Sequence, residues 1–517
     1  MKDIYKINKT NFKLQCIGIA LVVGSLFSSC TDDFEEINTN PNLPAVASSE
    51  TLLAGVEYNT FAEPRYVSWR GNLLFSSQFA NQFTTNVTGS WWAGADFYGY
   101  NVGWTDAVFD QSYKKSGLNL RNLLINYEEI GDQNGQAMVK IMMSLFHQKM
   151  TDVFGDIPYS DVIVSSLEVE PPLYDTQSDI YRGILGDLKT QMNAIGSSTA
   201  VIDGAGGDFI YGGDPQKWKA LANTLRLRMA LRSRDAFIAD GDQAFVDDVI
   251  NDCLANTLID ITNEATLIRS RSSLINSNLD GGFEDVYWGF GESGSGSGST
   301  WVLTDRYINL LQDNNDPRLT EIATTNSTGG YSGGFVNARS AVVWDDSSKP
   351  SEKIVGTGVD QIENQVPIMV LSAAESNFLQ AEAALLGFGG TANDLYQRGI
   401  LASMAFWGAN PGSFLADEAI ATLSGSNAEQ LTQVYNQRWL ASLTNGYESW
   451  ALVRRTDLIP QQTDDTNFWT SEPNNGNVPK RLQYSSTELI SNKSNVEEAI
   501  SKQGADIMST AVWWDVN

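Results

Sequence analysis

One long amphipathic helix in the middle of the chain constrains the fold more than any other feature. The segment DPQKWKALANTLRLRMALRSR, Asp214–Arg234, begins with an aspartate that can cap a first turn and a proline suited to the first helical position. Apolar residues then recur at helical spacing along one stripe: Trp218, Leu221, Ala222, Leu225 and Met229. Such a stripe has to be buried against other elements, so the chain is predicted to build its core from packed helices.

The same periodicity recurs along most of the chain. It predicts helices at Val67–Phe83, Trp104–Ile130, Gln136–Val153, Thr176–Ile195, Glu375–Gly387, Thr391–Trp407 and Ala428–Ser442. Each half of the chain carries helix pairs joined by short turns, which favours stacked helical hairpins of tetratricopeptide type. No clean repeat signature is present, so periodicity alone does not establish that arrangement.

A loop-rich region separates the two helical halves. Between residues 261 and 366 glycine, serine, asparagine and aromatic residues dominate, and helical stripes are few. We predict long loops and short strands inserted into the helical scaffold. Loops of this length on a rigid body are more often functional than idle.

Charge excludes some partners. The chain has 34 Lys and Arg against 62 Asp and Glu, a formal net charge of −28. Such a surface repels phosphate backbones and anionic lipid, so nucleic acid is not an expected partner. Four arginines nevertheless gather in the central helix, and we expect them to form ion pairs with neighbouring acidic helices: Arg226, Arg228, Arg232 and Arg234.

The first thirty residues have the layout of a bacterial lipoprotein signal. Four lysines precede the apolar run Cys16–Phe27, and the small residues Ser28 and Ser29 follow it. The run is shorter than the about 20 residues that span the hydrocarbon core, which argues against a transmembrane anchor. The next residue, Cys30, is predicted to become the lipidated mature N-terminus, although Phe27 and Ser29 depart from the strict pattern.

These observations predict three parts of the chain. Residues 1–29 are a signal peptide, residues 30–49 an acidic lipidated tether, and residues 50–517 a single domain. The acidic run after Cys30 resembles the export signal of surface lipoproteins of Bacteroidota, so we expect an outer-membrane protein that faces the cell exterior. Cys253 is then the one remaining thiol, and no intramolecular disulfide is expected.

Two short motifs match patterns found in enzymes, but each lacks the other features that its chemistry requires. GFGESG, Gly289–Gly294, matches the dinucleotide pattern, but no βαβ unit surrounds it. GYSGG, Gly330–Gly334, matches a nucleophile elbow around Ser332, which needs a histidine base. The single histidine, His147, lies in a helical stretch and is expected to be a packing or surface residue.

No cofactor is predicted. One histidine and one remaining thiol leave no zinc constellation, whereas the oxygen ligands that structural calcium needs are abundant. The many carboxylates also allow a glycosidase pair about 5 to 9 Å apart, a spacing that sequence does not measure. A surface glycoside hydrolase is therefore kept as an alternative to a protein that is not an enzyme.

Several stretches together resemble the SusD/RagB family of nutrient-binding outer-membrane lipoproteins. In the order of the family they are Thr151–Asp161 (TDVFGDIPYSD), Tyr211–Arg232, Asp316–Leu319 (DPRL), Ala374–Gly387, Gln437–Thr456 and Val478–Asn492. The resemblance covers essentially the whole mature chain. Within these stretches we interpret the following as packing and ion-pair residues rather than as a site: Tyr211, Trp218, Glu382, Trp439, Trp450 and Arg454.

The resemblance implies both a fold and a function. The implied fold is the SusD-like one, an all-α dominated body with four tetratricopeptide-like helix pairs and a loop-rich half that contains short strands. The implied function is capture of oligosaccharides at the cell surface and their delivery to a SusC-like TonB-dependent transporter in the outer membrane. Some members of the family bind peptides instead, and that alternative stays open.

Two aromatic clusters are candidates for the ligand site. GSWWAGADFYGYN, Gly89–Asn101, contains Trp91, Trp92 and Tyr98, and VYWGFGESGSGSGSTW contains Tyr287, Trp288 and Trp301. In the family, aromatic residues that contact ligand come from these two regions, a match of position without a shared motif. Because sugars favour flat aromatic faces and planar polar side chains, we expect both clusters to converge into a stacking platform with Asn81 nearby.

Overall fold

The computed structural model describes residues 47–61, 65–85, 98–99, 101–162, 171–267, 301–338, 346–355, 365–460 and 475–516, and only the backbone of residues 65–69. Ser49–Asn517 form one compact unit. The predicted signal peptide and the lipidation site Cys30 lie outside the described residues. Within the described ranges, no helix combines the length and the apolar character needed to cross a membrane.

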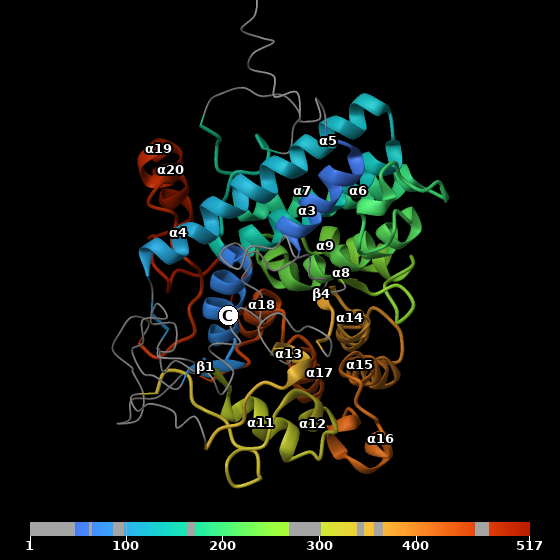
Figure 1. Ribbon diagram of the computed structural model, residues 1–517, viewed down its shortest axis with the longest axis vertical. Helices are drawn as coiled ribbons and strands as arrows, with labels where there is room; N and C mark the ends of the chain where they lie inside the picture. Colours follow the sequence, from blue (N-terminus) through green and yellow to red (C-terminus); the bar gives the residue numbers. More distant parts are fainter. Residues whose placement is uncertain are drawn as a thin grey trace, which may run out of the picture. The chain divides into compact units, whose positions relative to one another are not determined.

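Helices dominate both halves of the described chain (Figure 1). The N-terminal half contains α3 (Ser49–Thr60), the π-helix η1 (Arg65–Ser77), α4 (Val102–Gln111), the π-helix η3 (Ser112–Gly117), α5 (Leu118–Ile130), α6 (Gln133–Phe154), α7 (Gln177–Ile195), the short 3₁₀ turn η4 (Ala205–Gly207), α8 (Pro215–Ala239) and α9 (Gln243–Leu254). The C-terminal half contains α11 (Asp305–Gln312), α12 (Arg318–Ile322), α13 (Glu352–Val355), α14 (Ala373–Leu385), α15 (Ala392–Trp407), α16 (Phe414–Asp417), the 3₁₀ turn η5 (Ala419–Ala421), α17 (Asn427–Ala441), α18 (Gly446–Thr456), α19 (Glu488–Ser491) and α20 (Lys493–Gln503).

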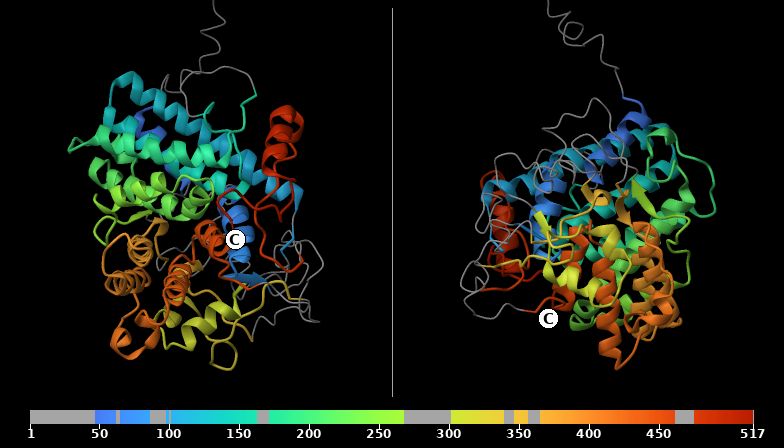
Figure 2. Two further views of the ribbon diagram at one scale, coloured as in Figure 1. Left: turned by 180° about the vertical axis from the view of Figure 1, so that it is seen from behind. Right: turned by 60° about the horizontal axis from the view of Figure 1, so that its bottom comes forward.

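Successive helices pack as hairpins. From α5 to α9 each helix contacts the next, and in the second half α14 packs on both α15 and α17. Figure 2 shows these helices stacked in layers, with α8 and α9 lying between the earlier helices and the α14–α15 pair. This arrangement confirms the predicted all-α dominated fold of tetratricopeptide-like helical hairpins.

Local signals at the helix ends explain where the hairpins turn. Gly131 ends α5 in the left-handed conformation at φ 72°, which glycine adopts without steric cost. Asp132 then caps α6 by accepting a hydrogen bond from the backbone N–H of Gly135 at 2.9 Å. Asp214 caps α8 in the same way and Pro215 is its first residue, as predicted.

The helix predicted at Val67–Phe83 is only partly correct. The observed helix η1 ends at Ser77, and Asn81 takes the left-handed conformation at φ 56°. This turn reverses the chain, so Phe83 begins strand β1 (Phe83–Thr85) instead of ending a helix. The strand partner lies far along the sequence, and helical periodicity carries no information about it.

The arginines of α8 form ion pairs with other helices, as expected. Arg226 pairs with Asp252 of α9, and Arg234 pairs with Asp247 of α9 at 2.8 Å. The α8 helix is buried on nearly every side, because its neighbours cover both the apolar stripe and the arginine face. The side chains of these four arginines are only 2–16% exposed, so they act mainly as ion-pair partners within the helical body.

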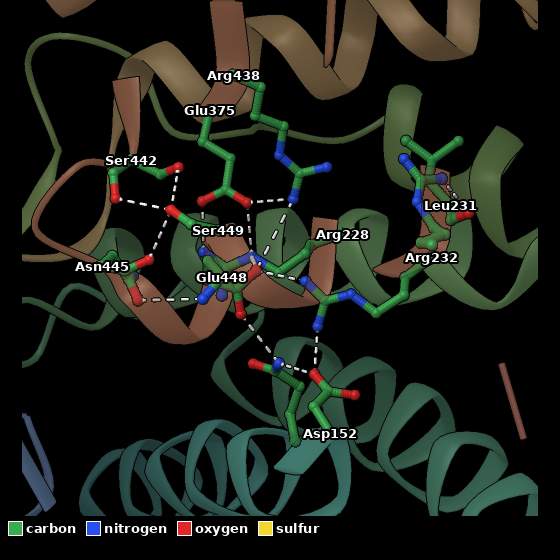
Figure 3. A network of polar contacts seen from close by, with 12 residues as sticks. Asp152, Arg228, Leu231, Arg232, Glu375, Arg438, Ser442, Asn445, Glu448 and Ser449 are labelled. Atoms are coloured by element: carbon green, nitrogen blue, oxygen red, sulfur yellow. Dashed lines mark hydrogen bonds and ion pairs between the residues drawn. The ribbon is translucent and has the colours of Figure 1, made fainter. Parts of the chain in front are cut away.

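A buried ionic network links five helices around α8 (Figure 3). Arg228 donates to Glu375 of α14 at 2.9 and 2.5 Å, and Arg232 pairs with Asp152 of α6 and Glu448 of α18. Arg438 of α17 donates to the same Glu375 at 2.5 Å. Burial by itself would raise the pKa of Glu448, but the guanidinium groups of Arg228, Arg232 and Arg438 hold this pKa below its ordinary value.

The residues that carry the family resemblance support the scaffold. The indole N–H groups of three buried tryptophans donate hydrogen bonds: Trp218 to Asp208 at 2.7 Å, Trp439 to the carbonyl of Ala80 at 2.8 Å and Trp450 to the carbonyl of Pro479 at 2.7 Å. Glu382 pairs with Arg455 at 2.6 Å. Arg454 is a packing residue, because it donates to the backbone carbonyls of Asp152 and Lys480 and lies 3.9 Å above the Trp450 ring.

The loop-rich region contains the predicted short strands. Strand β2 (Ala265–Leu267) pairs antiparallel with β4 (Ile368–Leu371), and β3 (Trp301–Leu303) pairs antiparallel with β1. The region also contains helices that were not expected, such as α11, which is capped by the side chain of Thr304. The eight residues of α11 make only about two helical turns. An apolar pattern over two turns is too short to distinguish a helix from a loop in the sequence.

Candidate ligand-binding site at the β1–β3 sheet

The β1–β3 sheet is the element that brings the two predicted aromatic segments together. Its strands pair in the register Phe83 with Leu303, Thr84 with Val302 and Thr85 with Trp301. Thr85 is the last residue of β1 and Trp301 is the first residue of β3. The segment that contains Trp91 and Trp92 therefore starts at the same end of the sheet where the segment that contains Tyr287 and Trp288 finishes.

Hydrogen bonds fix this sheet to the helical body. The side chain of Gln82 donates to the carbonyl of Trp439 in α17 at 2.9 Å, and the Trp439 indole returns a bond to Ala80. Thr304, which follows β3, binds the turn before β1, because its hydroxyl donates to the carbonyl of Asn81 at 2.7 Å and its N–H donates to the carbonyl of Gln82 at 3.1 Å. The roots of both segments are thereby held on the rigid scaffold.

Four of the predicted site residues, Trp91, Trp92, Tyr287 and Trp288, lie outside the described residues. Their convergence into a platform stays a prediction, supported by the pairing of the chain positions from which they extend.

Three predicted site residues are described, and all are buried. Trp301 is 0% exposed, Tyr98 is 1% exposed and Asn81 is 8% exposed. A ring stacks on a sugar only if one of its faces is open, so the expectation that Trp301 and Tyr98 supply stacking faces is wrong for this structure. Glycine-rich flanks suggested a surface position for Trp301, but strand pairing with β1 places it in the core.

The buried residues have structural roles instead. Tyr98 packs edge-on against Phe79 with ring centroids 6.1 Å apart, and burial raises the pKa of its hydroxyl. That hydroxyl has no hydrogen-bond partner in the described part of the chain. Asn81 provides the left-handed turn before β1 and accepts from Thr304 through its backbone carbonyl.

One aromatic residue beside the sheet was missed by the sequence reasoning. Phe335 is 52% exposed, and its carbonyl accepts a hydrogen bond from the hydroxyl of Thr84 at 3.3 Å. The preceding Gly334 forms a parallel bridge with Thr304. At Gly333 a Cβ atom would lie 2.2 Å from the Thr304 carbonyl carbon, so this close approach requires glycine.

The available signal for Phe335 was the glycine pair directly before it. The stretch GYSGGF resembles a nucleophile elbow, but its paired glycines also allow a chain to approach a neighbouring strand closely. Phe335 is thus a partly exposed aromatic residue that lies beside Thr84 of β1.

The enzyme motif at Ser332 does not form a catalytic site. The Ser332 hydroxyl donates to the backbone carbonyl of Asp346 and accepts from the Asn326 amide at 3.0 Å. The single histidine of the chain, His147, lies in α6, is 3% exposed and packs against Phe146. No imidazole base therefore accompanies the serine.

Within the described residues no group of three or more His, Cys, Asp or Glu side chains is arranged to hold an ion.

Comparison with solved structures places the fold. A chitin-binding protein shares 24% identity with a TM-score of 0.73, over 91% of this chain and 100% of its own. A SusD homologue from Bacteroides uniformis shares 22% identity with a TM-score of 0.76, over 91% of this chain and 99% of its own. A chitin-binding SusD homologue from Flavobacterium johnsoniae shares 21% identity with a TM-score of 0.75 over the same shares of the two chains.

A comparison with curated proteins gave no significant match. A comparison with family models gave a match. Residues 41–485 match the SusD-like model that is described as starch-binding and associating with the outer membrane. This match spans most of the chain and nearly all of its described helices. The protein therefore belongs to the SusD-like family of glycan-binding proteins associated with the outer membrane.

Proposed function

We propose that this protein is a cell-surface lipoprotein, attached to the outer membrane through Cys30, that captures oligosaccharides beside the β1–β3 sheet. It then delivers them to a SusC-like TonB-dependent transporter. The protein acts by binding and does not change its ligand.

The observation that carries the proposal is the pairing of Thr85 with Trp301. It places the starting points of two chain segments rich in tryptophan and tyrosine at one end of the sheet, and Phe335, which is 52% exposed, lies beside Thr84 of the same sheet. A ligand with flat, weakly polar faces is the one that several adjacent aromatic rings bind best, and sugar rings have such faces. The chitin-binding proteins of the same fold favour a glycan over the peptide alternative.

Isothermal titration with chito-, malto- and cello-oligosaccharides tests the capture step. We expect binding of at least one series, weakened up to about tenfold by Trp91→Ala, Trp92→Ala or Trp288→Ala, because a stacking ring contributes about 0.5–1.5 kcal/mol beyond burial. The matched control is Phe209→Ala, which removes a ring that is 59% exposed in the N-terminal helical half.

Two outcomes would contradict the proposal. Unchanged affinity in all three tryptophan variants would place the ligand elsewhere, and binding of peptides with no binding of any glycan would favour the peptide alternative. A separate assay for released sugar distinguishes capture from hydrolysis, because a glycoside hydrolase would shorten the polymer.

The delivery step is tested by isolating the protein from detergent-solubilised outer membranes. We expect a TonB-dependent barrel to be recovered with it, at roughly one barrel for each copy of this protein. Repeated recovery of this chain alone, while its sugar binding is intact, would leave capture standing and reject the transporter partnership.

A further inference from the structure

Lys149 interrupts a long buried stretch of α6. Every other residue from Ile141 to Phe154 is buried, whereas Lys149 is half-buried. Its side chain lines a cavity of about 100 Å³ whose walls come mainly from α3, η1, α6, β4 and α18. The lysine therefore combines contact with solvent with surroundings that are otherwise part of the helical body.

The amine of Lys149 has only neutral partners in the described part of the chain. Nζ donates to the backbone carbonyl of Thr60, the last residue of α3, at 3.2 Å, and it lies 5.5 Å from the centre of the Tyr447 ring. Burial raises the pKa of the Tyr447 hydroxyl, so this phenol does not supply a negative charge. A lysine that the fold holds for structural reasons is ordinarily paired with a carboxylate when it is withdrawn from water.

The buried carboxylates of the surrounding helices are engaged by other groups. Glu448 of α18 lines the same cavity, but it pairs with Arg228 at 3.4 Å and also with Arg232. Asp152 of α6 pairs with Arg232 as well. Glu57 of α3 accepts from a backbone N–H at 2.8 Å. Among the described residues, no carboxylate therefore forms an ion pair with the amine.

An amine in this environment is activated as a nucleophile. Burial lowers the pKa of Lys149 from an ordinary value of 10.5 to about 8. At pH 7 about one molecule in ten then carries the neutral amine, against fewer than about one in a thousand for an ordinary lysine. The neutral form is the one that attacks carbonyl carbons, and desolvated lysines are activated in this way.

The cavity limits the electrophile by its size. Its volume of about 100 Å³ lies well below the roughly 300–1,000 Å³ of pockets that enclose drug-sized ligands. Phe61, Leu145 and Val370 contribute apolar side chains to the walls. A molecule of a few heavy atoms fits this space, whereas a sugar ring does not.

Charge restricts the electrophile further. A carbamate formed from carbon dioxide would add a negative charge to a cavity that the Glu448 carboxylate also lines. An imine formed from an aldehyde adds no negative charge, and it carries the same single positive charge as the ammonium group when it is protonated. A short aldehyde is therefore the electrophile that these surroundings favour.

We propose that Lys149 is a covalent modification site for short aldehydes, about two to four carbons long. The lone pair of Nζ attacks the carbonyl carbon and forms a C–N bond. The carbonyl oxygen then leaves as water with both hydrogens of the amine, which gives an imine without oxidation or reduction. None of the residues that line this cavity belongs to the β1–β3 sheet, so the proposal does not depend on sugar capture.

Reductive trapping measures imine formation at each lysine of the folded protein. Propionaldehyde and sodium cyanoborohydride at pH 7 convert each imine into a stable propylamine, which peptide mass spectrometry locates and quantifies. Lys140 is the matched control, because it is also half-buried on α6. We expect propylation of Lys149 to be at least about tenfold faster than that of Lys140, since more of its amine is neutral.

The pH profile and the unfolded chain show whether the fold is the cause. In the folded protein the rate at Lys149 should level off above about pH 8, where most of the amine is already neutral. In concentrated urea the advantage over Lys140 should disappear. Lys149→Arg keeps a positive charge and a donor toward Thr60, so it should remove this one product while the melting temperature stays close to that of the parent.

Three results would overturn the proposal. Equal rates at Lys149 and Lys140 in the folded protein would show that the amine is not activated. A rate at Lys149 that still rises beyond about pH 10, or an advantage that persists in urea, would remove the fold as its cause. Trapping of maltose at Lys149 as fast as that of propionaldehyde would reject the restriction to short aldehydes.

Discussion

Thr85 and Trp301 face each other across an antiparallel strand pair, although the helices from α4 to α9 lie between them in the chain. Their pairing makes one short sheet the common origin of two long segments. It also separates two roles that the sequence alone assigns to one set of aromatic residues. Trp301 is fully buried and stabilises the strand pair, whereas Phe335 is 52% exposed.

Phe335 is predicted to contribute to oligosaccharide binding. Removing its half-exposed ring in Phe335→Ala should weaken affinity up to about tenfold, the equivalent of roughly 0.5–1.5 kcal/mol of stacking. Because the ring is not part of the core, the melting temperature should change little. Isothermal titration and thermal melting measure the two quantities, with Phe209→Ala as the matched control for loss of an exposed ring. Equal affinities of the two variants would remove Phe335 from the site.

Trp301 is predicted to behave in the opposite way. Trp301→Ala should lower the free energy of unfolding by about 3–5 kcal/mol, because it leaves a large cavity beside β1. Trp301→Phe should lose less, since most of the apolar volume remains. Urea denaturation of both variants checks this order. A Trp301→Ala protein with parental stability and reduced sugar affinity would restore the ligand-contact role that burial argues against.

The ionic network around α8 is predicted to be sensitive to the loss of one acid. Glu448→Ala leaves Arg228, Arg232 and Arg438 with less compensation in the interior, which should cost about 3–5 kcal/mol of stability. The control is Glu498→Ala, which removes an exposed pair with Lys502 at 2.7 Å and should change stability little. Denaturant midpoints of the two variants give the comparison. Similar losses of stability would contradict the prediction that the buried network depends more on its acid than the exposed pair does.

Glu57 is predicted to make the fold less stable as pH rises. Burial, with the nearby charge and hydrogen bond of Asp208, raises the pKa of Glu57 from an ordinary value of 4.5 to about 10. Between these values the folded state holds a proton that the unfolded state has lost, so stability should fall as pH increases. This contribution is fully present below about pH 4.5 and lost as pH rises through the folded pKa.

The test is Glu57→Gln, which keeps a hydrogen-bond donor toward Asp208 and removes the titration. Urea midpoints measured from pH 6 to 9 should decline less steeply for the variant than for the parent protein. Parallel declines would show that other groups, and not Glu57, determine the alkaline dependence.

Cys30 is predicted to carry the lipid anchor. Cells fed a labelled lipid precursor should incorporate it into the protein, and Cys30→Ala should abolish that label and release the protein from the membrane. Cys253→Ala is the matched control, because this thiol is buried in α9 and should not be acylated. Label that persists in Cys30→Ala would reject the lipoprotein assignment.

The sequence alone was sufficient to predict those elements whose physical cause lies within one continuous segment. The cap at Asp214, the proline after it and the apolar stripe predicted α8 nearly to its observed start, because a helix satisfies its backbone within one segment. The pairing of Arg226 and Arg234 with other helices was also predictable, since buried charge in an acidic chain requires partners. The family resemblance extended these local signals to the whole body.

Only the tertiary structure decided the rest. No local pattern distinguishes a tryptophan that stacks on a ligand from Trp301, whose three-residue strand is defined by a partner before α4. The turn at Asn81 and the exposure of Phe335 likewise depend on neighbours distant in sequence. Short strands and loops gain their stability from long-range contacts, whereas helical periodicity is written along one continuous segment.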